Sequence, residues 1–173
     1  PNKAAGLGNI RTEMLQHLGL RAQKWLLDMF NTCLATNTIP RVWRKSKIIA
    51  LPKPGKDANL PGSYRPISLL CHPYKLMERC ILNRIVLDVD NILIPEQAGF
   101  RHGKSTTGQL LNLTQHIEDG FERKLITGAA FVDLSAAYDT VNHRIMKVKL
   151  QQTLQDSHLV QFIMTMMKNR RFF

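Results

Sequence analysis

The chain has 173 residues, of which 44% are hydrophobic and 21% are charged. This composition excludes disordered, collagen-like and coiled-coil proteins and predicts a folded globular structure. Lys and Arg number 24 against 13 Asp and Glu, so the formal net charge is +11, an excess typical of proteins that bind phosphate-rich partners. The apolar runs are much shorter than the ~20 residues of a membrane helix, and we therefore expect no membrane span.

The chain ends and the cysteines bear on where the protein comes from. The chain opens at Pro1 without an initiator Met or a hydrophobic leader and closes on two phenylalanines, so we expect it to be a piece cut from a longer protein. The three cysteines lack the paired spacing of zinc ligands, which predicts buried thiols in a reducing, intracellular compartment. They are Cys33, Cys71 and Cys80.

The first part of the chain predicts a helix, a strand and a basic loop. Apolar residues recur at helical spacing over residues 22–34, which predicts an amphipathic helix that packs its apolar stripe into the core and ends before Pro40. The β-branched run at residues 46–51 predicts a strand. Residues 53–65 are rich in Gly and Pro, as in a loop or hairpin tip. From residue 41 to residue 65 the chain carries seven Lys and Arg against one Asp, so this region is strongly basic.

Two further helices are predicted on either side of a polar loop. Residues 73–88 keep helical spacing and begin with Pro73, which suits the first turn of a helix. Residues 94–104 are polar and rich in turn formers. Ser105 is then a suitable N-cap for a helix that ends near Gly120. The junction between this loop and the helix should be exposed.

The last part of the chain predicts a buried strand followed by two helices. Residues 125–132 are nearly all apolar, which predicts a strand buried on both faces. Asp133 follows directly and leads through a polar turn into a helix that contains Val141 and Ile145. A final helix is expected over residues 156–167. The predicted elements thus include both helices and strands, as in the α+β class.

Asp133 is the residue whose position most directly suggests chemistry. A rigid strand that ends in a carboxylate, followed by the small residues Ser135, Ala136 and Ala137, could hold a metal ligand beside space for a substrate. An Asp at the end of a strand is also a common turn former or helix N-cap. The spacing alone leaves both interpretations open.

Four sequence blocks resemble reverse transcriptases of non-LTR retrotransposons of the LINE and jockey type. Residues 131–141, FVDLSAAYDTV, resemble motif A, the palm strand that carries the first catalytic aspartate of that family. The other blocks occur in the family's order: residues 2–6, the pair of fingers segments at residues 49–57 and 63–70, and residues 97–106. The resemblance spans nearly the whole chain and implies a partial right-hand polymerase fold. Residues 1–124 would form helix-rich fingers with a basic strand-loop tip, and residues 125–173 would form the start of the palm.

The resemblance implies roles for individual residues. Asp133 would be the catalytic residue and the metal ligand for two Mg²⁺ ions, and Tyr138 would be the aromatic gate that selects deoxynucleotides. Lys53 and Arg65 would bind the incoming triphosphate. Template or primer would contact a set of three residues in the loop before the helix that begins at Ser105: Phe100, Arg101 and Lys104. The implied partners are an RNA template, a DNA primer and dNTPs, in a protein of the nucleus and cytoplasm.

Each implied role has a structural alternative. Tyr138 could simply pack in the core, Lys53 and Arg65 could belong to a solvated basic tip, and Asp139 is expected to cap or hydrogen-bond in the first turn of a helix. Where the family has Gly-Arg-Ser-Thr, this chain has Lys104, which keeps the charge but not the guanidinium fork. The chain contains no Asp-Asp dipeptide, whereas the family completes its site with adjacent aspartates. Two alternative functions therefore stay open: a catalytically dead, basic nucleic-acid-binding remnant, and a structural fragment without partners.

Overall fold

The computed structural model describes residues 4–173, so Asn2 and Lys3 of the first motif lie outside the described residues. Within residues 4–173 the chain forms six α-helices and three strands, which confirms a mixed helix and sheet fold. The helices are α1 (Thr12–Gln16), α2 (Leu20–Ala35), α3 (His72–Asp90), α4 (Thr106–Glu122), α5 (His143–Thr153) and α6 (Ser157–Met167). The strands are β1 (Lys45–Pro52), β2 (Tyr64–Leu69) and β3 (Arg171–Phe172), and two short 3₁₀ helices are η1 (Arg41–Arg44) and η2 (Pro61–Ser63).

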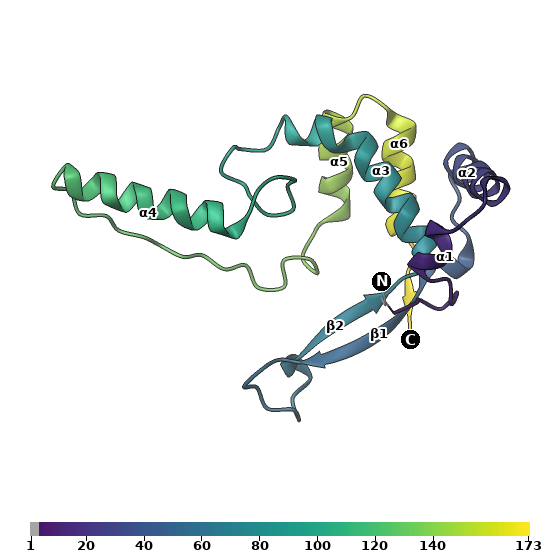
Figure 1. Cartoon of the computed structure of the whole chain (residues 1–173), viewed down its shortest axis with the longest axis horizontal. Coiled ribbons are helices and arrows are strands. Elements are labelled where there is room, and N and C mark those ends of the chain that lie inside the picture. Colours follow the sequence, from purple (N-terminus) through teal and green to yellow (C-terminus); the bar gives the residue numbers. More distant parts are fainter. Residues whose placement is uncertain (1–3) are drawn as a thin grey trace.

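The sheet is small and its central strand is β1. Strands β1 and β2 form an antiparallel hairpin in which Ile49 lies opposite Ile67 and Leu51 opposite Arg65. Strand β3, at the end of the chain, pairs in parallel with the start of β1, so that Lys45 lies opposite Arg171. The hairpin extends away from the helices, and its base is close to the C-terminus (Figure 1). This arrangement confirms the strand expected at residues 46–51 and the hairpin tip expected at residues 53–65.

The hydrophobic core lies where α2, α3, α6 and η1 meet. Trp43 is at its centre, with ring centroids 6.0 Å from those of both Phe30 and Tyr74. Phe162 and Met77 are buried beside them. The Tyr74 hydroxyl donates a 2.8 Å hydrogen bond to the Met166 carbonyl oxygen, so this polar group is satisfied inside the core. Burial raises the pKa of Tyr74, and the nearby Arg170 opposes that shift.

The predicted helices are present, with local corrections in α5 and α2. Helix α5 begins at His143, so Val141 lies before it and not within it as predicted. Only the second half of α2, with Met29, Phe30 and Cys33, reaches the core. Trp25 is exposed and borders an open apolar groove shared with α1, so the stripe is not core along its whole length. Burial raises the pKa of the Cys33 thiol. Cys33 and Cys71 are buried as predicted, whereas Cys80 is exposed.

Side-chain caps fix the starts of the later helices. Ser105 Oγ accepts a 3.1 Å hydrogen bond from the Gly108 amide and begins α4, as the sequence predicted. Asp156 Oδ1 accepts one of 2.9 Å from the Leu159 amide and begins α6. Asn142 caps α5, so Asp139 is neither the cap nor in the first helical turn, contrary to the prediction. Asp139 instead lies exposed in a turn closed by its own amide and the Ala136 carbonyl.

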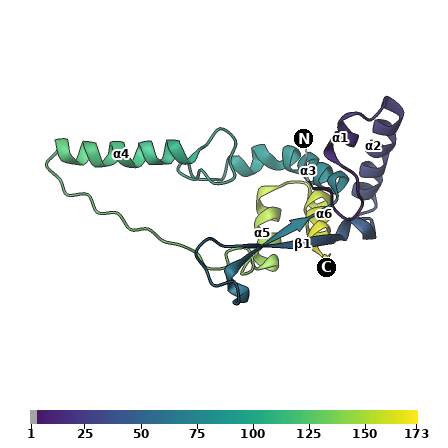
Figure 2. The ribbon, with the colours of Figure 1, turned by 60° about the horizontal axis from the view of Figure 1, so that its bottom comes forward.

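The predicted buried strand at residues 125–132 does not form. These residues run as an extended, unpaired segment from the end of α4 back toward α5 (Figures 1 and 2). Phe131 is 88% exposed and Ile126 is fully exposed. A strand needs a neighbour to pair its backbone N–H and C=O groups, and the sheet of residues 4–173 consists only of β2, β1 and β3. The predicted buried strand is therefore wrong, although the segment has extended backbone.

Candidate functional site

The hairpin tip carries Lys53 and Arg65 and is ordered by its own hydrogen bonds. Lys53 is half-buried, and its Nζ donates a 2.9 Å bond to the Gly62 carbonyl, while its amide donates to Ser63 at 2.7 Å. The Tyr64 hydroxyl closes the tip by donating to the Ala58 carbonyl. Arg65 is exposed on β2, and within residues 4–173 its guanidinium has no hydrogen-bond or ion-pair partner. Of the two cations predicted to bind the triphosphate, Lys53 is therefore anchored within the tip, whereas, among the described residues, Arg65 is free at the same end of the hairpin.

The loop after α3 uses two of its predicted nucleic-acid-binding cations to shape itself. Arg101 forms a 3.2 Å ion pair with Asp90 at the end of α3 and donates a 2.9 Å hydrogen bond to the Ile94 carbonyl. Lys104 Nζ donates a 3.2 Å bond to the Pro95 carbonyl. These bonds fold residues 94–105 back on themselves. The loop holds Phe100 almost completely exposed, at 97%, with a positive φ of 62°.

The segment between α4 and α5 carries Asp133 and Tyr138. Asp133 is exposed, and in the described part of the chain its carboxylate forms no hydrogen bond or ion pair. Tyr138 is 78% exposed, so it does not lie in the core. It also borders a cavity of about 580 Å³, which is lined by residues of α3 and α6, among them Ile81 and Ile163, and by Arg170 after α6.

The fold brings Phe100 and Tyr138 together. Their ring centroids are 6.4 Å apart and their planes meet at 82°, an edge-to-face contact. This contact joins the loop after α3 to the turn after the extended segment, across 38 positions of sequence (138 − 100). Arg101 and Lys104 lie in the same loop, so these two elements place four of the predicted residues in one neighbourhood.

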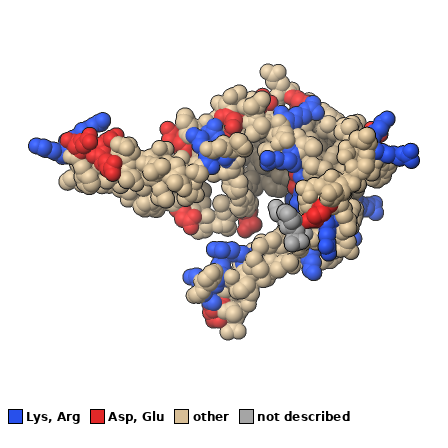
Figure 3. Space-filling view, in the orientation of Figure 1, with Lys and Arg blue, Asp and Glu red and all other residues tan. Residues whose placement is uncertain are grey.

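Other predicted residues are not brought together. Within residues 4–173, no hydrogen bond or ion pair joins Asp133 to Lys53 or Arg65. Figure 3 shows open space between the projecting hairpin and the part of the chain formed by α4 and the segment that returns from it.

The described residues supply an incomplete metal site. No group of three or more His, Cys, Asp or Glu side chains is positioned to hold a metal ion among residues 4–173. Divalent cations take six or more oxygen ligands, and two neighbouring cations need more anionic charge than a single carboxylate provides. Asp133 therefore fits the part of one ligand, but these residues alone do not fit a site for two Mg²⁺ ions.

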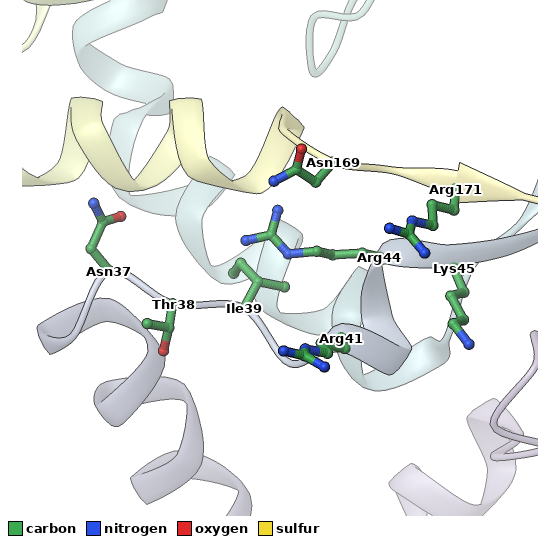
Figure 4. A pocket seen from close by; sticks show the side chains of 8 residues that line it. All are labelled: Asn37, Thr38, Ile39, Arg41, Arg44, Lys45, Asn169 and Arg171. Atoms are coloured by element: carbon green, nitrogen blue, oxygen red, sulfur yellow. The ribbon is translucent and has the colours of Figure 1, made fainter.

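The fold also forms a basic pocket that the sequence did not predict. Its cations are Arg41, Arg44 and Lys45 at the base of the hairpin and Arg171 from β3 (Figure 4). The first three belong to the basic region noted in the sequence. The contribution of Arg171, 126 positions beyond Lys45 (171 − 45), follows only from the parallel pairing of β3 with β1.

Comparison with known proteins identifies the family. Residues 51–172 match the family described as "Reverse transcriptase (RNA-dependent DNA polymerase)". The chain therefore belongs to the reverse transcriptase family, which confirms the resemblance seen in its motifs. Members of this family generally use divalent metals. None of the helices within residues 4–173 is long and apolar enough to cross a bilayer.

The relatives are proteins of mobile elements. The chain is 40% identical over 151 residues to "Probable RNA-directed DNA polymerase from transposon BS" of Drosophila melanogaster, covering 85% of this chain and 17% of that protein. It is 33% identical over 173 residues to the corresponding protein of transposon X-element, also of Drosophila melanogaster, covering 99% and 19%. It is 32% identical over 174 residues to "RNA-directed DNA polymerase from mobile element jockey" of Drosophila funebris, covering 99% and 19%. The chain thus spans 17–19% of the length of these relatives.

Proposed function

We propose that the chain forms the fingers, residues 1–124, and the start of the palm, residues 125–173, of a right-hand RNA-directed DNA polymerase from a mobile element. The reaction would transfer a nucleotide from a dNTP to the 3′-hydroxyl of a DNA primer on an RNA template. The observation that carries the proposal is the position of Asp133: its carboxylate is exposed and unpaired, five residues before Tyr138 (138 − 133), which contacts Phe100. The reducing environment inferred from three free cysteines supports action inside the cell, in the nucleus and cytoplasm.

Asp133 would supply one carboxylate of the catalytic metal site. Its exposure supports this role, because both carboxylate oxygens are accessible to a cation. Together with the remaining ligands of the complete site, Asp133 would hold a divalent metal, which would supply activation of the attacking hydroxyl and neutralisation of charge on the transferred phosphate. The further acids would come from other parts of the polymerase. We therefore expect the 173-residue chain by itself to give no primer extension.

Tyr138 and Phe100 would form the wall against the sugar of the incoming nucleotide. An aromatic edge held by a second ring is a rigid surface, and a rigid surface can exclude a 2′-hydroxyl by its bulk. Arg101 and Lys104 support this role indirectly, since their bonds to Asp90, Ile94 and Pro95 hold the loop that presents Phe100. Arg101 is then a positioning residue, although its remaining donors could still meet a phosphate.

Lys53 and Arg65 would bind the triphosphate from the hairpin tip. The bond from Lys53 to Gly62 fixes the ammonium in the tip, and the unpaired guanidinium of Arg65 offers a fork suited to phosphate oxygens. The two cations lie at the end of a two-stranded hairpin that extends away from the helices (Figure 1). Such a hairpin can bend toward the palm when substrate binds.

A chimera tests the proposed reaction. The 173 residues replace the aligned stretch of the jockey polymerase of Drosophila funebris, and primer extension is measured with a DNA primer, an RNA template, dNTPs and Mg²⁺. We expect extension by the chimera and its loss, by about 100-fold or more, in the Asp133→Asn variant. Asp28→Asn, which removes an exposed acid from α2, is the matched control and should keep activity. A folded chimera without activity, or an active Asp133→Asn chimera, contradicts the proposal.

The sugar gate has a separate test in the same chimera. Tyr138→Ala should raise incorporation of ribonucleotides relative to deoxynucleotides, and Phe100→Ala should do so to a smaller extent because it removes the support rather than the gate. The ratio of kcat/KM values for the two nucleotides is the measurement. Tyr138→Phe keeps the ring and should keep the discrimination. If Tyr138→Ala selects deoxynucleotides over ribonucleotides as well as the unchanged chimera does, the proposed sugar gate is contradicted and the ring has only a structural role.

The single carboxylate favours one alternative function, a nucleic-acid-binding remnant without catalysis. A net charge of +11 would support such binding without any metal. In this alternative the chimera binds a primer and template with the expected salt dependence but fails to extend the primer. The polymerase proposal predicts both binding and extension, so the two readouts separate the functions.

A further inference from the structure

A second concentration of positive charge lies at the base of the hairpin, opposite to the tip that carries Lys53 and Arg65. It is a pocket of about 790 Å³ whose lining combines the segment after α2 with the residues after α6. The eight residues around it, termed here the basic pocket, are Asn37, Thr38, Ile39, Arg41, Arg44, Lys45, Asn169 and Arg171. Figure 4 shows that the side chains of Arg44 and Arg171 approach the same space from facing segments.

The basic pocket holds uncompensated charge. Four of its eight lining residues are Lys or Arg and none is Asp or Glu. Within residues 4–173 the side chains of Arg41 and Arg171 have neither an ion pair nor a hydrogen bond. Like charges gathered in one cavity repel one another, so a bound anion would stabilise the arrangement.

Arg44 is fixed in place by the end of α6. Its Nη1 donates to the carbonyl oxygen of Thr165, at 3.2 Å, and to that of Lys168. The Lys168 carbonyl lies at the end of the helix, where it has no hydrogen-bond partner within the helix. Its Nε and Nη2 hydrogens have no partner among the described residues. Because the guanidinium is already positioned, little side-chain entropy is lost when the remaining donors bind an anion.

The sheet holds the other cations beside it. Lys45 lies opposite Arg171 in the parallel pair of β1 and β3, and Lys45 Nζ is 5.7 Å from the centroid of the Phe173 ring. The segment that carries Arg41 and Arg44 is anchored through the buried side chains of Ile39 and Trp43. The cations therefore sit on packed backbone rather than on a loose loop.

We propose that the basic pocket binds phosphates of a nucleic-acid strand, as a contact surface separate from the hairpin tip and from Asp133. Several cations within one cavity suit a run of backbone phosphates better than a single charge, and Arg is the side chain best matched to phosphate oxygens. Lys and Arg side chains gather at the base of the hairpin as well as at its tip (Figure 3). Membership of the reverse transcriptase family makes a nucleic acid the source of these phosphates.

Binding of a labelled single-stranded RNA oligonucleotide to the 173-residue chain tests the proposal. Fluorescence anisotropy is measured over a range of KCl concentrations in EDTA, so that the result does not depend on metal chemistry at Asp133. The test variant is Arg41→Gln with Arg171→Gln. The control is Arg144→Gln with Lys147→Gln, which removes the same charge from exposed positions on α5.

The test variant should weaken RNA binding and lower the slope of log K against log salt by about 1.4, or ~0.7 for each lost phosphate contact. The control should change the slope less. Arg41→Lys with Arg171→Lys should restore most of the slope, because a backbone phosphate needs the charge. Equal slopes for test and control variants would overturn the proposal, since general charge would then explain the binding.

Competition distinguishes strand phosphates from a free anion. Inorganic phosphate and pyrophosphate are added at constant ionic strength, and thermal unfolding is followed with and without each anion. The proposal predicts that neither displaces the RNA below millimolar concentration. Displacement at micromolar pyrophosphate, together with a thermal shift that the test variant lacks, would assign the pocket to a small anion and overturn its assignment to nucleic acid.

Discussion

Two regions of this molecule have similar apolar content and opposite environments. In the packed region, where α2, α3 and α6 meet, Phe162 is 0% exposed. In the arm, made of α4 and the segment that returns from it, Phe131 is 88% exposed although it stands in an equally apolar run. The arm extends away from the other helices (Figure 1). The difference teaches that an apolar pattern fixes the local backbone shape, whereas burial depends on a partner surface.

Truncation of one phenylalanine in each region should give the largest contrast. Phe162→Ala leaves a cavity in the core and should lower the free energy of unfolding by about 3–5 kcal/mol. Phe131→Ala removes a ring that is already in water and should change it by less than about 0.5 kcal/mol. Urea denaturation of both variants measures the two values. A large loss of stability in Phe131→Ala would mean that the arm is packed in solution.

Substitution of one glycine beside packed backbone and one in the arm tests the same difference in packing. A Cβ added at Gly6 would lie 2.5 Å from the Leu70 carbonyl carbon, which is backbone and cannot turn aside. Gly6→Ala should therefore cost about 1–3 kcal/mol of unfolding free energy. Gly128 in the arm has nothing within 4 Å of that position, so Gly128→Ala should be neutral or slightly stabilising. Equal effects in denaturant unfolding would contradict the contrast.

Sequence reasoning predicts the helices well because their signals are local. The helical spacing of α2 and α3, the Ser105 cap of α4 and the position of α6 all depend on residues within a few turns of one another. The largest failure, the buried strand predicted at residues 125–132, concerns an element that needs a neighbouring strand. Periodicity cannot report whether such a neighbour is present.

The candidate site also has features that local sequence predicts and features that it does not. The motifs identified Asp133, Tyr138 and Phe100 one by one, and whether they carry the assigned roles stays a prediction. That the rings of Phe100 and Tyr138 touch, and that Arg101 pairs with Asp90, depends on contacts between separate elements. The basic pocket depends on Arg171 reaching β1, which no local pattern of charges indicates.

Removal of a helix cap in each region should give a smaller difference in stability than the phenylalanine and glycine substitutions. Asp156 caps α6, which carries the buried side chains of Leu159 and Phe162, so Asp156→Ala should lower the free energy of unfolding by about 0.5–2 kcal/mol. Ser105 caps α4, in which Gly120 is the only buried residue. Ser105→Ala should reduce helical circular dichroism but leave the main unfolding midpoint unchanged. A common shift of the midpoint in both variants would show that the arm unfolds together with the core.

The ionisation of Tyr74 should give the smallest effect, visible only at alkaline pH. Burial raises the pKa of Tyr74 in the folded protein above that of the unfolded chain, about 10. The folded state therefore holds its proton more tightly, so the stabilisation is complete below about pH 10 and is lost as the pH rises through the folded pKa.

Tyr74→Phe isolates this ionisation. Its free energy of unfolding should be lower at neutral pH, because the hydrogen bond to Met166 is lost, but should fall less steeply above about pH 10. Cys33, whose pKa burial also raises, contributes an alkaline loss of the same sign to both proteins and cancels in their difference. Urea unfolding at a series of pH values measures that difference. If the free energies of unfolding of the two proteins ran parallel with pH, the Tyr74 hydroxyl would be accessible to water. The centre of the packed region would then be as open to solvent as the arm.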